Sequence, residues 1–138
     1  MSNSLGRHII VEFHDCSESA LQNPEGVRDA LQKAALDAEM TLLEVSSVKT
    51  SSGVSGWAVI AESHLTAHTF VKERHCAIDM FFCRKDCRYD EAMGVLAKYF
   101  NPQKISIRIL DRGEIVRSLQ IQEDGHRPVH AVTSFPPS

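Results

Sequence analysis

A Glu-Ser-His triplet at residues 62–64 offers a serine hydroxyl that could attack a carbonyl carbon. A second histidine, His68, follows Ser63 by five positions. Imidazole has an unperturbed pKa of about 6.5, so it can accept a proton from a serine hydroxyl near neutral pH. Side chains alternate between the two faces of a flat strand, so Ser63 and His68 can meet only if the chain bends between His64 and Ala67. Taken alone, such a serine and histidine are more typical of a solvated loop and a polar strand end.

The longer string around this triplet is more specific than the triplet itself. Residues 53–70 read GVSGWAVIAESHLTAHTF, which gives a GVSG turn, an apolar run, the ESH triplet, and an HT pair followed by an aromatic residue. Cys83 lies further along the chain. The string, with the cysteine at this spacing, resembles the self-cleavage segment of the S-adenosylmethionine decarboxylase proenzymes of the short bacterial and archaeal type. The resemblance extends from Gly6 to about Ile121.

The resemblance implies that the chain cuts itself between Glu62 and Ser63. The Ser63 hydroxyl would attack the carbonyl carbon of Glu62 and convert the peptide bond into an ester. Elimination would then release residues 1–62 and leave dehydroalanine, which hydrolyses to a pyruvoyl group and ammonia. In the family, the residue that matches Ser55 assists the acyl shift, and the residue that matches His68 is the base for processing.

The resemblance also implies a pyruvoyl-dependent decarboxylase that needs neither pyridoxal phosphate nor a metal. The ketone of the pyruvoyl group forms a Schiff base with the α-amine of a small amino-acid-type substrate, and its amide carbonyl draws off electrons as carbon dioxide leaves. In the family, the residue that matches Cys83 returns the proton to the product. A free cysteine is otherwise most often a small buried hydrophobic residue.

Two positions that read the substrate depart from the family pattern. A phenylalanine before the GVSG turn stacks on adenine in the family, and the glutamate of an HTWPE string binds ribose; the matching residues here are Lys49 and Lys72, while Phe70 keeps an aromatic ring. Lysine cannot accept hydrogen bonds from ribose hydroxyls. We therefore expect a polyamine-forming decarboxylase of L-ornithine or L-arginine, with Glu73 accepting the terminal cation. The alternatives are S-adenosylmethionine as substrate and a non-catalytic homologue that activates an enzyme.

Composition favours an ordinary globular domain. The chain has 138 residues, of which 43% are hydrophobic and 24% charged, and a net charge of −3 gives no reason to expect a nucleic acid or an anionic membrane as partner. We find no apolar run near the ~20 residues of a membrane span and no signal-peptide pattern, so we expect a cytoplasmic protein. The four cysteines have no CxxC spacing, so we expect thiols and reject a zinc site at Cys83 and Cys87.

Apolar periodicity predicts the elements. Strands are expected at residues 8–13, 41–48, 54–62, 76–82 and 105–109, and a turn at 111–113 would lead into a further strand at 114–121. Helices are expected from Asn23-Pro24 to about Ala38 and over residues 90–100.

These elements predict a single α+β domain over residues 1–138. Two β-α-β-β halves would form one mainly antiparallel sheet with both helices on one face. Because the other face then needs cover, we expect two sheets to pack together in a homodimer with αββα layers. Cleavage would divide the chain into residues 1–62 and 63–138, and residues 122–138 are expected to be a flexible tail.

Overall fold

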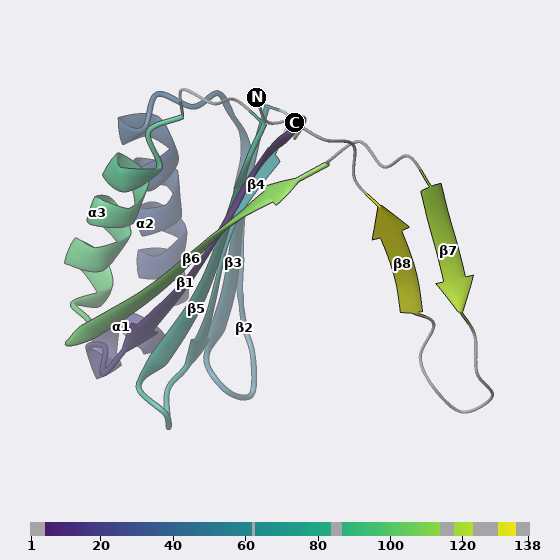
Figure 1. Ribbon diagram of the computed structural model, residues 1–138. Coiled ribbons are helices and arrows are strands. Elements are labelled where there is room, and N and C mark those ends of the chain that lie inside the picture. The colour runs from purple at the N-terminus through teal and green to yellow at the C-terminus, as the bar shows by residue number, and fades with distance from the viewer. Residues whose placement is uncertain (1–4, 62, 84–86, 114–117, 123–129, 135–138) are drawn as a thin grey trace.

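The computed structural model describes residues 5–61, 63–83, 87–113, 118–122 and 130–134, with side chains for the first three of these ranges. Figure 1 shows a curved sheet with helices along one of its sides. The predicted α+β class, the mainly antiparallel sheet and the placement of the helices on one face are confirmed.

Six strands form the main sheet, and every pair of neighbours is antiparallel. They are β1 (Gly6–His14), β2 (Leu42–Lys49), β3 (Val54–Ile60), β4 (Ser63–Phe70), β5 (His75–Phe82) and β6 (Lys104–Arg112). Their order across the sheet is β2-β3-β4-β5-β1-β6. The N-terminal strand β1 therefore lies between β5 and β6, two strands from later in the chain.

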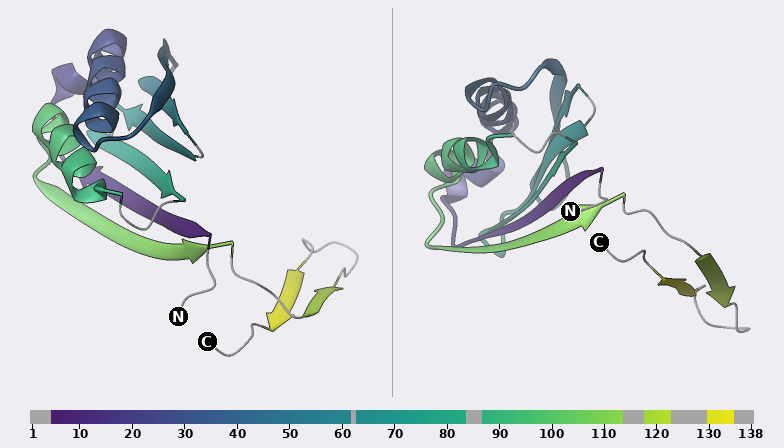
Figure 2. Two further views of the ribbon diagram at one scale, coloured as in Figure 1. Left: turned by 90° about the horizontal axis from the view of Figure 1, so that it is seen from above. Right: turned by 45° about the horizontal axis from the view of Figure 1, so that its top comes forward.

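The helices α1 (Glu18–Gln22), α2 (Pro24–Asp37) and α3 (Tyr89–Phe100) lie on one side of this sheet (Figure 2). The start of α2 follows from its sequence. The Asn23 side chain accepts a hydrogen bond from the backbone N–H of Gly26 at 3.0 Å, and Pro24 occupies the first helical turn, where its missing N–H is tolerated. At the end of α3, Asn101 adopts a left-handed conformation with φ 50° and donates its N–H to Ala97.

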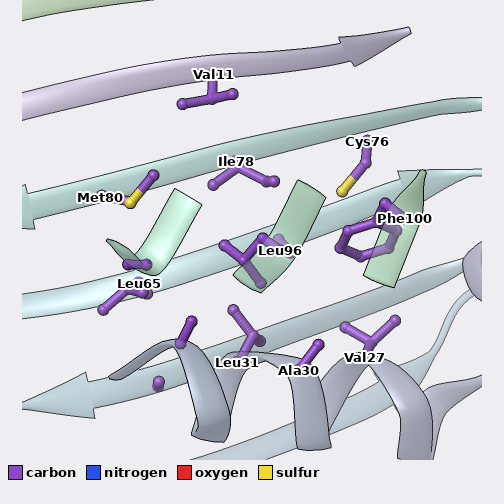
Figure 3. Packing of buried hydrophobic residues seen from close by; sticks show 14 of the residues in the cluster. Val11, Val27, Ala30, Leu31, Leu65, Cys76, Ile78, Met80, Leu96 and Phe100 are labelled. Carbon is purple, nitrogen blue, oxygen red and sulfur yellow. The ribbon is translucent and has the colours of Figure 1, made fainter. Parts of the chain in front are cut away.

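The core lies between the sheet and these helices because alternate strand residues point toward α2 and α3. In Figure 3, Val27, Ala30 and Leu31 of α2 and Leu96 and Phe100 of α3 face Leu65 of β4 and Cys76, Ile78 and Met80 of β5. The opposite face of the main sheet carries no helix among the described residues (Figure 2). We call this opposite surface the open face.

The structure corrects three sequence expectations. Residues 63–70 form a strand that was not predicted, and this strand is unbroken, so the expected bend between His64 and Ala67 is absent. The five-residue helix α1 was also not predicted. The strand after the turn does not extend the main sheet: residues 114–117 of the predicted strand lie outside the described residues, and β7 (Ser118–Gln122) pairs instead with β8 (His130–Ser134) in a separate two-stranded sheet.

Candidate active site

Ser63 is the first residue of β4, directly after a very short connection from β3. Ile60 of β3 pairs with Ser63, so only Ala61 and Glu62 link the two strands. Glu62, the other residue of the predicted cleavage bond, lies outside the described residues. The Ser63 hydroxyl oxygen is buried and has no hydrogen-bond partner among the described atoms. Buried polar groups are normally hydrogen-bonded, so an unpaired hydroxyl here makes Ser63 a candidate active-site residue.

Ser63 lines a cavity of about 210 Å³, which we call the Ser63 cavity. Cys83, which directly follows β5, also lines it, because the antiparallel pairing of His64 with Phe81 brings the end of β5 beside the start of β4. The remaining lining residues come from the connection between α2 and β2, the ends of β3 and β5, the β3–β4 connection and the two residues before α3: Ala38, Glu39, Met40, Thr41, Ile60, Ala61, Phe82, Cys87 and Arg88. The predicted pyruvoyl residue and the predicted proton donor therefore share one cavity.

Two charged residues, Arg88 and Glu39, line the Ser63 cavity. The Arg88 guanidinium lies 3.4 Å from the carboxylate of Glu39 and 3.0 Å from that of Glu91. Glu39 has a φ of 60°, a left-handed conformation that is uncommon for residues other than glycine. Neither Arg88 nor Glu39 was predicted as a site residue, and their only sequence signal was the closeness of Arg88 to Cys83 along the chain.

Ser55 and His68 form a second group on the open face. They are register partners on β3 and β4, and the Ser55 hydroxyl oxygen lies 2.9 Å from Nδ1 of His68. This hydrogen bond joins the two residues predicted to assist processing. His68 is five residues from Ser63 along a continuous strand, which places the two roughly 16 Å apart at about 3.3 Å per residue. The side chains also point to opposite faces, so His68 does not reach Ser63 within one protomer.

The predicted substrate-binding residues lie at the same end of the sheet as Ser55 and His68. Lys49 ends β2 and Phe70 ends β4, while Lys72 and Glu73 lie in the turn between β4 and β5. All four are exposed. The structure thus divides the predicted site into one group at Ser63 and Cys83 and another at the far end of the sheet.

Histidine–carboxylate pairs on the open face were missed by the sequence analysis. Nε2 of His8 lies 2.7 Å from the Asp79 carboxylate, and Nε2 of His75 lies 2.6 Å from that of Glu12. The signal was present in the period-two alternation of β1 and β5, whose polar positions point away from the apolar ones. Pairing between the strands could not be read from either one alone.

Cys16 and Cys76 are fully buried on the helix side. Burial raises the pKa of Cys16 to about 11 and raises that of Cys76 well above its usual range. Among the described residues, no group of three histidine, cysteine or acidic side chains is arranged to hold a metal ion. In the same part of the chain, no helix has the length and apolarity to cross a membrane.

Comparisons with known proteins show which family the chain resembles. A model of the family described as S-adenosylmethionine decarboxylase matches residues 7–113. Proteins named S-adenosylmethionine decarboxylase proenzyme are similar to the chain: that of Thermosipho melanesiensis is 39% identical, over 75% of this chain and 81% of its own length. The protein of that name from Thermomicrobium roseum is 38% identical, over 82% and 97%, and that of Methanococcus aeolicus is 35% identical, over 81% and 97%.

The fold has a solved counterpart as well. The crystal structure of the adenosylmethionine decarboxylase from Aquifex aeolicus superposes with a TM-score of 0.75 at 20% sequence identity, covering 85% of this chain and 98% of that one. The chain is a pyruvoyl-dependent carboxy-lyase by class. It belongs to the S-adenosylmethionine decarboxylase family.

Proposed function

We propose that this protein is a proenzyme that cuts itself between Glu62 and Ser63, converts Ser63 into a pyruvoyl group, and decarboxylates S-adenosylmethionine. The observation that carries the proposal is the buried Ser63 hydroxyl, which has no hydrogen-bond partner among the described atoms and shares its cavity with Cys83. An unpaired buried hydroxyl destabilises a fold by about 1–3 kcal/mol, so its retention here fits a nucleophile kept available for reaction.

The position of Ser63 suits an attack on the preceding carbonyl. The connection between Ile60 and Ser63 is only two residues long, so the peptide bond before Ser63 lies in the short link between β3 and β4. Attack by the hydroxyl forms an ester, and loss of the α-proton of residue 63 then expels the Glu62 carboxylate. The dehydroalanine that remains takes up water and releases ammonia, which leaves the pyruvoyl group at the start of β4.

Two copies of the chain would complete the site. The Ser63 and Cys83 group lies at one end of the sheet, whereas the Ser55 and His68 pair lies at the other. Two sheets that pack through their open faces, running in opposite directions, would bring the Ser55–His68 end of one protomer toward the Ser63 end of its partner. The separation of these two groups within one chain is what supports the proposal of a homodimer in which each site draws on both chains.

After cleavage, the pyruvoyl group supplies the electron sink for loss of carbon dioxide. Cys83 lines the same cavity and is the group that we assign to return the proton to the product.

S-adenosylmethionine is the substrate that the relatives favour. The relatives carry the name of a decarboxylase of this compound, and the expected preference for L-ornithine or L-arginine finds no support among them. That expectation rested on Lys49 and Lys72, which are exposed at the end of the sheet distant from the Ser63 cavity in the same protomer. The choice of S-adenosylmethionine therefore rests on the relatives and not on the position of the two lysines.

The experiment combines intact mass with a decarboxylation assay. Wild-type protein should separate into a chain of 62 residues and a chain of 76 residues that begins with pyruvoyl, while Ser63→Ala should stay whole at 138 residues. Processed protein should release carbon dioxide from S-adenosylmethionine with a higher kcat/KM than from L-ornithine or L-arginine. Uncut wild-type protein after long incubation would refute the processing step, and a faster reaction with either amino acid would refute the substrate.

A further inference from the structure

The four cysteines fall into two pairs with different surroundings. Cys16 and Cys76 are completely buried, and burial raises the pKa of both thiols. The thiolate is the form that reacts with oxidants, so these two cysteines should be inert. They serve as internal references for the other pair.

Cys83 and Cys87 are only partly buried, and both line the Ser63 cavity. Cys83 directly follows β5, and Cys87 lies two residues before the first residue of α3, Tyr89. The Arg88 guanidinium, which is paired with the carboxylates of Glu39 and Glu91, lines the same cavity.

We propose that Cys83 and Cys87 form a redox pair in which a peroxide joins the two sulfur atoms as a disulfide. In the first step one thiolate attacks a peroxide oxygen, the O–O bond breaks, and a sulfenic acid forms. The second thiol then displaces the hydroxyl group from that sulfur, so that one hydrogen peroxide and two thiols give one disulfide and two waters. Cys83 would lose the proton that the proposed function assigns to it, so oxidation would stop decarboxylation until a thiol reductant breaks the bond.

The bond can be detected without enzyme activity in the Ser63→Ala background. Trypsin cuts after Arg84 and Lys85, which separates residues 75–84 from residues 86–88. After treatment with hydrogen peroxide under native conditions, a Cys83–Cys87 disulfide should hold these two peptides together, with the loss of two hydrogen atoms, until dithiothreitol is added. Because residues 75–84 also contain Cys76, the link must persist in Cys76→Ala and disappear in Cys87→Ser.

Separate peptides in peroxide-treated Cys76→Ala, or a sulfinic acid on Cys83 beside an unmodified Cys87, would overturn the proposal. In processed wild-type protein, peroxide should lower decarboxylation by about 10²-fold or more, as expected for a lost general acid, and dithiothreitol should restore it. Cys87→Ser, compared with its own untreated sample, should show no loss that dithiothreitol reverses. Linked peptides in a protein without decarboxylase activity would uphold the redox pair and reject the proposed function.

Discussion

Thr69 shows how a single polar residue holds the strand that carries the predicted site residues. It is fully enclosed beside His68, and its hydroxyl donates a hydrogen bond to the carbonyl of Leu21 at 2.7 Å. The same oxygen accepts the backbone N–H of Val54, also at 2.7 Å. One side chain therefore connects β4 to the start of β3 and to α1.

Thr69→Val should lower the free energy of unfolding by about 1–3 kcal/mol, because the N–H of Val54 and the carbonyl of Leu21 would lose their buried partner. Urea titration of uncleaved Ser63→Ala protein measures this difference. Thr69→Ser keeps the hydroxyl and should lose less stability than Thr69→Val. Equal midpoints for the two variants would show that the hydroxyl does not stabilise this strand.

Cys83→Ala should separate processing from turnover. The acyl shift needs a hydroxyl and a base rather than this thiol, so the variant should still yield the two shorter chains. Its decarboxylation should fall by about 10²–10⁴-fold, the usual effect of losing a general acid. Intact mass follows the first property and carbon dioxide release the second; a wild-type rate of release would disprove the proton-donor assignment.

At the scale of the elements, contact between α2 and the sheet depends on a glycine in β3. A Cβ atom on Gly56 would lie 2.8 Å from Cδ1 of Leu31 and 2.9 Å from Cγ1 of Val27. Gly94 in α3 offers a contrast, because a Cβ atom there would meet nothing within 4 Å. The first glycine is needed for close packing, whereas the second only weakens its helix.

Gly56→Ala should therefore destabilise the protein by about 1–3 kcal/mol through overpacking. Gly94→Ala should stabilise it by about 0.5–1 kcal/mol, because alanine has the higher helix propensity. Thermal unfolding of both variants in the uncleaved background gives the signs directly. A stabilising Gly56→Ala would contradict the close packing of α2 on β3, and a destabilising Gly94→Ala would contradict the open space beside α3.

The sequence predicted most elements because their signals are local. Each of these signals lies within a single segment: the apolar stripe and the Asn23 cap of α2, and the alternating isoleucines of β6. The strand β4 was missed because its inward positions are Leu65, Ala67 and Thr69, of which two are small or polar. A glycine with φ 74° does stand at the predicted turn, but the pairing partner of β7 depends on residues further along the chain.

At the scale of the whole molecule, the sequence predicted which residues belong to the site. It did not predict how far apart Ser63 and His68 lie in the folded chain. The string places Ser63 and His68 close together in the chain, whereas the straight strand separates them to opposite ends and opposite faces. No local pattern reports whether a strand bends, because strand pairing on both sides decides it. The distance that results is the argument for a site built from two protomers.

Mixing two inactive variants tests that arrangement. Ser63→Ala keeps the Ser55–His68 pair, and His68→Ala keeps the Ser63 hydroxyl. If the site is shared, coexpression of the two should produce cleaved His68→Ala chains, which neither variant forms alone. Absence of cleavage in a mixture that is shown to contain both chains in one dimer would mean that each protomer processes itself.

The strand order affects whether a molecule can refold after self-cleavage. A cut after residue 62 would leave β1, β2 and β3 on one polypeptide and β4, β5 and β6 on the other. Because β1 lies between β5 and β6, one strand of the first polypeptide would be held between two strands of the second. We therefore expect the sheet to form while the chain is still continuous. A molecule that unfolds after the cut would need to rebind a separate polypeptide in order to refold. Self-cleavage would therefore turn a reversible folding reaction into one that each molecule completes only once.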